Sequence, residues 1–152
     1  MGDVVQTLTW QTSIQSGRTL TPFAGDPVNG WTLSTSPTPA AANPDQSSNT
    51  GGAYQVIMTE ILPNPFGNDT AETLQGTGEF IEIMNNGTSA VDLTGWSIMS
   101  GSTLPLDSST TSNLILESGE YAIFTAYDPS SFWLSNNGGS ISILDAFGNA
   151  VN

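Results

Sequence analysis

The chain has 152 residues, of which 37% are hydrophobic, so it is long enough to bury the core of one domain. It carries 14 acidic residues against one basic residue, Arg18, and it contains no cysteine and no histidine, which gives a net charge of −13. The shortage of basic residues argues against nucleic acid and anionic membrane surfaces as partners, and the lack of Cys, His and Lys removes the usual catalytic groups. No apolar run reaches membrane-spanning length, so we expect no membrane insertion and a protein that is not an enzyme.

Short runs rich in β-branched and aromatic residues predict an all-β fold. In residues 79–84 the alternation places Phe80 and Met84 on the opposite face from Ile81 and Ile83. Gly and Asn turn residues separate the runs, and no segment shows a sustained helical period. Many short antiparallel strands with turns at this spacing predict a β-sandwich. The predicted strands are residues 4–10, 54–62, 79–84, 93–99, 120–126 and 140–144, the last followed by a tight turn at 145–148.

Residues 34–53 differ from the rest of the chain, because they are rich in Pro, Ala, Ser and Gly and show no periodicity. Such a composition is typical of an extended surface connector. The sequence therefore divides into an N-terminal piece, a linker and a main body, with bounds at residues 3–43, 44–53 and 54–152.

The main body contains several blocks in a characteristic order: "TEILPNP" (59–65), "GEFIEIMNNGTSAVDLTGWSI" (78–98), "LESGEYAIF" (116–124) and "LSNNGGSISILDAFGN" (134–149). Together they resemble the lamin-tail domain family, which is found in nuclear lamins and in many prokaryotic surface or secreted proteins. The resemblance implies an immunoglobulin-like β-sandwich of the prokaryotic extracellular type. The core residues that we expect in it are Trp31, Phe80, Ile81, Ile83, Leu93 and Trp96.

The remaining family motifs stand at the beginning of this chain instead of its end. In the family, the closing hairpin is followed by a final strand, a Gly-Arg segment, a Trp and a Pro-Thr-Pro exit. The matching residues here are "DVVQTLTW" (3–10), "SGRTL" (16–20) with Arg18, "GWTLS" (30–34) with Trp31, and "SPTPAAAN" (36–43) with Ala40 in place of the usual Gly. The resemblance therefore implies a circularly permuted strand order, in which residues 3–43 complete the fold.

We expect the edge at residues 140–152 to stay open until residues 3–10, from this copy or a neighbour, pair with it. The chain could be a segment that straddles two tandem domains, it could close on itself, or it could donate the strand to the next molecule. The leading interpretation is an extracellular or cell-surface structural module that assembles head to tail into a filament. The alternative is a self-closed monomeric adhesion or ligand-binding domain of a larger surface protein. The predicted complementation interface comprises Val4, Val5, Leu8, Trp10, Ile141, Ile143 and Val151.

Candidate ligand contacts lie in two loops. Asn68, Asp69 and Glu72 offer hard oxygen donors of the kind that calcium prefers, although their spacing matches no EF-hand, and we expect no other cofactor. Phe132 and Trp133 could stack on a carbohydrate or on a partner protein, or could instead cap the end of the sandwich.

Carboxylates are the other groups that could do chemistry. Glu79 and Glu82 should point to opposite faces of their strand, whereas Glu60 with either could form a glycosidase-like pair. Since nothing else in the sequence supports a catalytic site, we interpret these residues as structural carboxylates.

Overall fold

The computed structural model describes residues 7–11, 13–14, 16–23, 26–34, 38, 55–65, 78–108, 111, 113–125 and 134–150. Within these ranges all regular structure is β-strand, and no helix is present that could cross a membrane. The strands are β1 (Thr7–Trp10), β2 (Arg18–Phe23), β3 (Asp26–Ser34), β4 (Val56–Asn64), β5 (Phe80–Asn85), β6 (Val91–Asp92), β7 (Ser97–Ser100), β8 (Ser102–Pro105), β9 (Ile115–Leu116), β10 (Tyr121–Thr125) and β11 (Gly139–Leu144).

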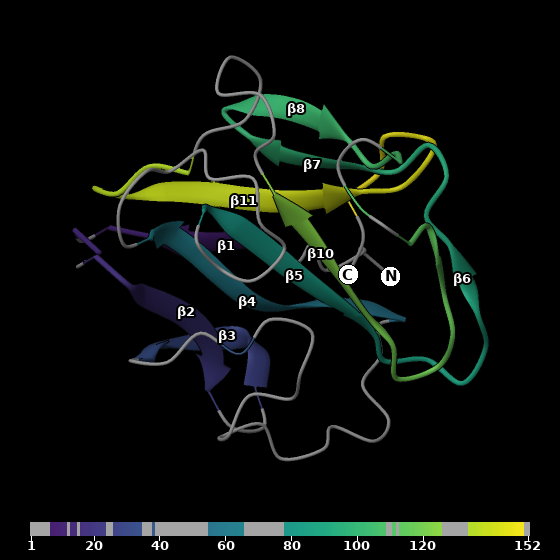
Figure 1. Cartoon of the computed structure of the whole chain (residues 1–152), viewed down its shortest axis with the longest axis horizontal. Helices are drawn as coiled ribbons and strands as arrows, with labels where there is room; N and C mark the ends of the chain where they lie inside the picture. Colours follow the sequence, from purple (N-terminus) through teal and green to yellow (C-terminus); the bar gives the residue numbers. More distant parts are fainter. Residues whose placement is uncertain are drawn as a thin grey trace.

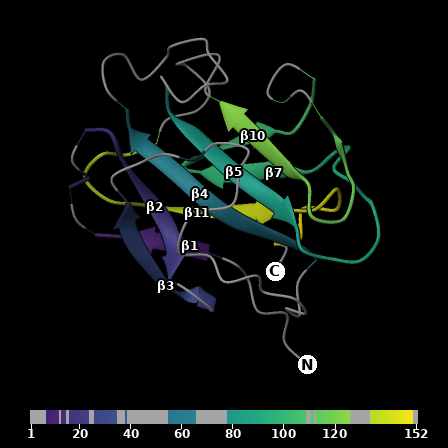
Figure 2. The ribbon, with the colours of Figure 1, turned by 60° about the horizontal axis from the view of Figure 1, so that its bottom comes forward.

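The strands form two facing sheets and a short ribbon (Figure 1). One sheet has the order β1-β11-β7-β8 and the other the order β10-β5-β4-β2-β3, while β6 pairs with β9. Every pairing is antiparallel. Figure 2 shows the same layers from below, with β1 beside β11 and with β2 and β3 beyond β4. The predicted all-β sandwich is therefore confirmed.

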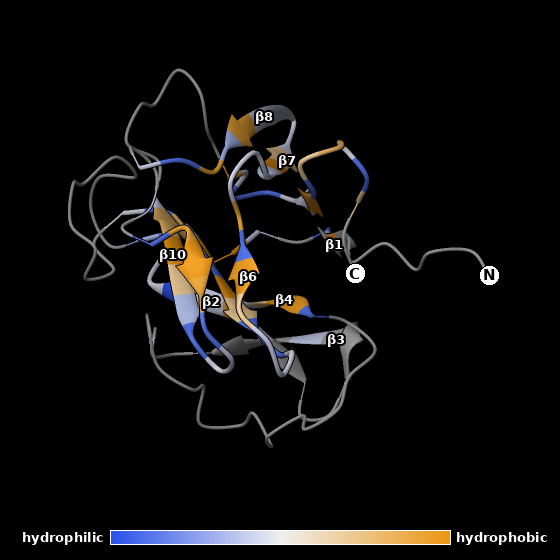
Figure 3. Cartoon of the chain, turned by 90° about the vertical axis from the view of Figure 1, so that its right-hand side faces the viewer, coloured by the Kyte–Doolittle hydropathy of each residue, from blue (hydrophilic) through white to orange (hydrophobic). Residues whose placement is uncertain are grey.

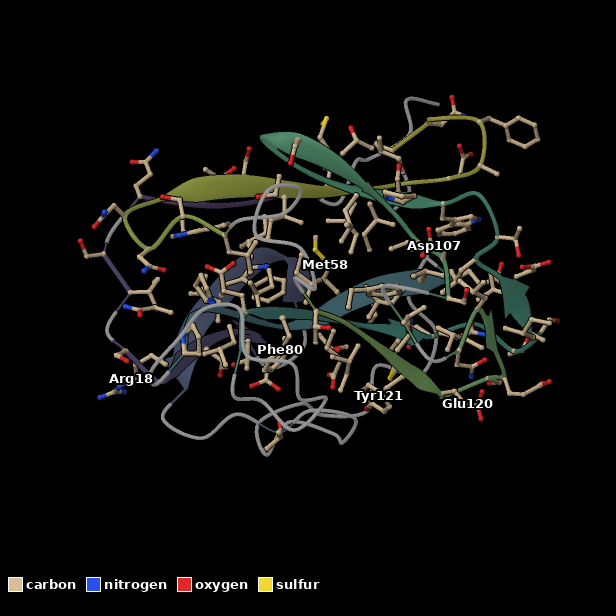
Figure 4. All side chains as sticks on the ribbon, turned by 45° about the horizontal axis from the view of Figure 1, so that its top comes forward. Arg18, Met58, Phe80, Asp107, Glu120 and Tyr121 are labelled. Atoms are coloured by element: carbon tan, nitrogen blue, oxygen red, sulfur yellow. The ribbon has the colours of Figure 1, made fainter. Side chains whose placement is uncertain are left out.

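The core lies between the two sheets because the inward positions of their strands are apolar. Ile81 and Ile83 of β5, Ile98 of β7 and Ile141 of β11 are all fully buried there. Figure 3 shows apolar colouring on the strands of both layers and polar colouring on many of the turns. In Figure 4, Met58 points into the space between the sheets, whereas Phe80 and Tyr121 point to the other side of β4 and β5.

The second face of the β4–β5 pair is buried as well. Ile57 and Leu62 of β4 and Phe80 of β5 are at most 4% exposed, although they lie outside the core between the sheets. Among the described residues, Thr38 contacts this face, through hydrogen bonds to Glu60. The β4–β5 pair is therefore shielded from water on both faces, which accounts for the unbroken burial of β4 from Val56 to Pro63.

The prediction of one strand over residues 93–99 is wrong. A turn at Thr94 and Gly95 separates β6 from β7, and Gly95 has φ +81°, a conformation that glycine adopts without strain. The Asp92 carboxylate accepts a hydrogen bond from the Thr94 amide at 2.9 Å, as an aspartate at the start of a turn commonly does. Hydrogen bonding from the Thr94 side chain, and secondly from its amide, lowers the pKa of Asp92.

Candidate strand-complementation site

β1 lies along the edge of β11 and extends its sheet. The antiparallel register sets Leu8 opposite Ile141 and Thr9 opposite Ser140. Leu8 is 4% exposed and belongs to the core, whereas Thr9 and Ser140 are exposed on the other face. β1 thus combines main-chain pairing with apolar anchors on alternate residues, which is how strands are added to sheet edges.

Trp10 is the largest apolar side chain described in β1, and it packs against Ser135, Gly138 and Gly139 of the turn before β11. We call these three residues the seat of Trp10. Its indole N–H donates a hydrogen bond to the carbonyl oxygen of Ser135 at 3.0 Å, and the side chain is 6% exposed. A Cβ on Gly139 would come within 3.0 Å of the indole ring, and a Cβ on Gly138 would come within 2.9 Å of the Trp10 carbonyl oxygen. The two glycines therefore let the tryptophan approach this turn closely.

The residues that follow β1 are hydrogen-bonded to segments of both sheets. The Ile14 amide donates to the carbonyl oxygen of Asn136 at 2.8 Å, and the side-chain amide of Asn64 donates to the Ile14 carbonyl oxygen at 2.6 Å. The Gly17 amide in turn donates to the carbonyl oxygen of Asn64 at 2.6 Å. This stretch crosses from the sheet of β11 to the sheet of β4 and fixes the position of β1 relative to both.

β2 then completes the second sheet in the way that β1 completes the first. It pairs with β4, with Arg18 opposite Asn64 and Leu20 opposite Ile61, and a register irregularity lies between the two pairs. Leu20 is buried in the core at 6% exposure. The N-terminal segment from β1 to β3 therefore supplies strands to the edges of both sheets.

The turn that follows β11 has the form that the sequence predicts. The Gly148 amide donates to the Asp145 carbonyl oxygen at 2.9 Å, and Gly148 has φ +78°. The Asp145 carboxylate accepts hydrogen bonds from the amides of Phe147 and Asn149, both at 2.8 Å, and from the Asn149 side chain at 3.0 Å. The Asn149 side-chain hydrogen bond is the main reason that the pKa of Asp145 is lowered. The returning chain then forms a β-bridge between Ala150 and Leu144.

The carboxylates considered above for acid–base chemistry serve as hydrogen-bond acceptors inside the fold. Glu60 and Glu82 are opposite one another on β4 and β5, and both are fully buried. Glu82 accepts a hydrogen bond from the Thr59 hydroxyl at 2.5 Å, and Glu60 accepts one from the Thr38 amide at 3.0 Å. Burial, and to a lesser degree the negative charge of Glu82, raises the pKa of Tyr121 beside this pair.

Glu79 lies one residue before β5 and holds a different segment. Its carboxylate is 1% exposed and accepts a hydrogen bond from the Leu134 amide at 3.0 Å. Two of the buried glutamates, Glu60 and Glu79, therefore hold residues 38 and 134 against the sheet, while Glu82 accepts a hydrogen bond from the neighbouring strand β4. In the described part of the chain, no group of three acidic residues is arranged to hold a metal ion.

Glu60→Gln should stabilise the protein at pH 7. Burial raises the pKa of Glu60 above its ordinary value of 4.5, against smaller opposing effects of Thr19 and Thr38. The stabilising contribution of the protonated Glu60 side chain is therefore complete below pH 4.5, and it is lost as the pH rises through the raised pKa. Glutamine keeps an acceptor for the Thr38 amide without the charge. Urea unfolding should show the variant more stable than the wild type at pH 7, with a difference that shrinks towards pH 4.5.

The exposed change Glu117→Gln is the matched control and should leave the stability nearly unchanged. A Glu60→Gln variant less stable than the wild type at pH 7 would mean that the hydrogen bonds to the carboxylate outweigh the cost of burying it.

The expected core residues occupy three kinds of position. Ile81, Ile83 and Leu93 lie in the core between the sheets, and Phe80 is fully buried on the outer face of β5. Trp31 and Trp96 are half-buried and pack against the core from its rim. The predicted residues Val4, Val5, Val151, Phe132, Trp133, Asn68, Asp69 and Glu72 lie outside the described residues.

Sequence reasoning missed the residues that receive β1. Gly138 and Gly139 stand in an Asn-Gly-Gly run that indicates a turn, but a glycine pair beside a strand is also a signal of close backbone approach. Ser135 and Asn64 contact Trp10 and Ile14 across long sequence separations, so no local pattern could identify them.

Comparison with known proteins locates the N-terminal segment relative to a recognised domain. The family model described as Lamin Tail Domain matches residues 46–152, a range that contains β4 to β11 but not β1, β2 or β3. No curated protein and no solved structure matches the chain. Because the match covers most of the sequence and the fold is an all-β sandwich, the chain belongs to the Lamin Tail Domain family, a family of immunoglobulin-like structural domains.

Proposed function

We propose that this protein is a non-catalytic extracellular module that joins identical copies head to tail by donating its N-terminal segment. In this proposal, residues 7–38 of one copy complete the β11 and β4 edges of the next copy. One observation carries the proposal: in each sheet, a strand of the family match pairs with a strand that precedes the match. β11 pairs with β1, and β4 pairs with β2. The same contacts support a circularly permuted relation to the family.

The exchange needs no contact beyond those of the closed fold. The register of β1 and the seat of Trp10 are the same whichever copy supplies the segment, as in domain swapping. About 20 residues separate β3 from Gln55, and such a length could span up to about 65 Å when extended. Each copy would give one segment and receive one, so an arrangement that does not close into a ring forms an open filament.

An extracellular surface is the proposed location. The chain has one basic residue among 152 and its polar surface is rich in Ser, Thr and Asn. A net charge of −13 would keep separate assemblies apart at low salt, and salt would screen that repulsion.

A self-closed monomer that acts in adhesion or ligand binding is the second candidate. The observation in its favour is that β1 pairs with β11 of the same chain. In this candidate, Phe132 and Trp133 would contact a carbohydrate or protein partner, and Asn68, Asp69 and Glu72 would be the residues to test for calcium.

Mixing two single-cysteine variants should separate these candidates, because the natural chain has no cysteine. Thr9 and Ser140 face one another and are exposed, so we would prepare Thr9→Cys and Ser140→Cys separately, unfold and refold them together, and oxidise the mixture. Donation between copies predicts covalent dimers containing one chain of each kind, seen by mass spectrometry, and filaments in electron micrographs of the wild type.

The control is a mixture of Met99→Cys and Thr103→Cys, which face one another across the tight β7–β8 hairpin. Because that hairpin forms within one copy, mixed dimers are not expected from it. Discrete particles in the micrographs, with no more mixed dimer from the Thr9 and Ser140 variants than from this control, would contradict donation and leave the self-closed monomer.

A further inference from the structure

Two of the Asn-Gly pairs in the chain lie beside strands of the sandwich. Asn86-Gly87 follows β5 and Asn137-Gly138 precedes β11, whereas a third pair, Asn29-Gly30, lies within β3. An asparagine before a glycine can lose its side-chain amide without an enzyme, because the glycine has no Cβ to hinder the attack of its own main-chain nitrogen on the asparagine. The surroundings of each pair decide how readily this reaction occurs, and they differ between the two pairs beside strands.

The Asn86-Gly87 pair is held on both sides. The Asn86 amide donates a hydrogen bond to the carbonyl oxygen of Gln55 at 2.7 Å, and the Gly87 amide donates one to the side-chain oxygen of Asn85 at 2.9 Å. An added Cβ on Gly87 would come within 2.7 Å of Cγ of Gln55, so this glycine is closely packed. The side-chain nitrogen of Asn86 is buried. This pair can therefore react only after the turn opens locally.

The Asn137-Gly138 pair has the opposite surroundings. Asn137 is exposed, so water reaches its side-chain amide and can carry away the ammonia that it releases. The hydroxyl of Ser13 donates a hydrogen bond to Oδ1 of Asn137 at 2.8 Å. Negative charge develops on this oxygen when a nitrogen attacks the side-chain carbon, and a hydrogen-bond donor placed there stabilises that charge. Exposure and the Ser13 hydrogen bond therefore both favour reaction at this pair.

We propose that Asn137 is a modification site, at which the folded chain loses ammonia and becomes aspartyl or isoaspartyl while Asn86 stays intact. The main-chain nitrogen of Gly138 bonds to Cγ of Asn137, the Cγ–Nδ2 bond breaks, and the proton of the attacking nitrogen leaves with the ammonia. Water then opens the resulting cyclic imide. Cleavage of its Cγ–N bond gives aspartate, and cleavage of its other C–N bond gives isoaspartate, in which the main chain runs through Cγ. Water is consumed, ammonia is released, and no group is oxidised or reduced.

The isoaspartyl product disturbs the seat of Trp10, because it adds a carbon atom to the main chain directly before Gly138. An added Cβ on Gly138 would come within 2.9 Å of the carbonyl oxygen of Trp10, and one on Gly139 would come within 3.0 Å of its indole ring. A longer main chain displaces both glycines, so β1 is held less firmly. The aspartyl product leaves the main chain unchanged and keeps an acceptor for the Ser13 hydroxyl. This inference goes beyond the proposed function and holds whichever copy supplies β1.

Incubation of the folded wild-type protein in mildly alkaline buffer tests the site. Peptide mapping by mass spectrometry follows the conversion of each asparagine. The matched control is the same incubation in urea, where the fold no longer distinguishes the two pairs. We expect Asn137 to convert at least about tenfold faster than Asn86 in the folded protein, and at a similar rate in urea. Equal rates in the folded protein, or a faster conversion of Asn86, would overturn the proposal.

A second measurement tests the effect on β1. The isoaspartyl form, purified from the incubated protein, would be compared with the variant Asn137→Asp, which carries the same added charge on an unchanged main chain. We expect the isoaspartyl form to melt about 5 °C below this variant. Equal melting temperatures would contradict the loosening of β1. Neither measurement depends on whether the wild type forms filaments, so failure here is distinct from failure of head-to-tail assembly.

Discussion

Trp10→Ala should lower the free energy of unfolding by about 3–5 kcal/mol, the usual cost of truncating a buried aromatic residue. The side chain is 6% exposed, belongs to the core and donates a hydrogen bond to Ser135, so the change removes apolar burial and takes the donor from a partly buried hydrogen bond. Urea unfolding followed by circular dichroism would measure the loss.

Trp10→Phe separates the two contributions. Phenylalanine retains most of the apolar area and removes the indole N–H, so we expect a smaller loss of roughly 1–2 kcal/mol. If Trp10→Ala costs less than about 1 kcal/mol, the value typical of an exposed position, then Trp10 is not an anchor of the fold.

Gly138→Ala should lower the free energy of unfolding by about 2–5 kcal/mol, because two penalties coincide at this residue. Gly138 has φ +121°, which an alanine adopts only with strain, and its added Cβ would stand 2.9 Å from the carbonyl oxygen of Trp10. The contact is with main chain, so it can be relieved only by moving β1 or the turn.

Gly119→Ala is the matched control. Gly119 also has a positive φ, +81°, but an added Cβ there would meet no atom within 4 Å. It should therefore show the backbone strain alone, about 1–2 kcal/mol. Thermal or urea unfolding of both variants gives the comparison, and equal losses would mean that β1 does not lie against Gly138.

The relation between sequence and structure is clearest on β5. Alternation predicts which of Phe80, Ile81 and Ile83 share a face, and the two isoleucines indeed point into the core while Phe80 does not. The turn at 145–148 is likewise predictable, because its Asp and Gly are local signals for a tight turn. Local periodicity and turn chemistry therefore determine these elements.

Long-range features of the fold were harder to predict. Residues 26–34 form β3, a strand that neither alternation nor turn residues indicate in full, and its pairing with β2 has a register shift between Pro22 and Phe23. Burial of the outer face of β4 depends on contacts with residues far away in sequence, such as Thr38 on Glu60. No local pattern encodes contacts of that kind.

The candidate site was predictable in part. Leu8 and Trp10 follow from the alternation of β1 and from the resemblance to the family, because an apolar segment was needed beside Ile141. The seat of Trp10 depends on the fold of residues 134–139, and the register of β1 on β11 appears only when their pairing is known. Register across a sheet is a tertiary property.

The central claim is that β1 completes the edge of β11 in the register observed. The double variant Thr9→Cys with Ser140→Cys tests it directly, since these residues are opposed and antiparallel partners have Cα atoms about 4.5–5.5 Å apart, within the range that a disulfide can bridge. After mild oxidation of the folded protein, peptide mapping should find the two introduced cysteines joined, within one chain or between neighbouring copies. Free thiols at both positions in protein that retains its native circular dichroism spectrum would contradict the claim.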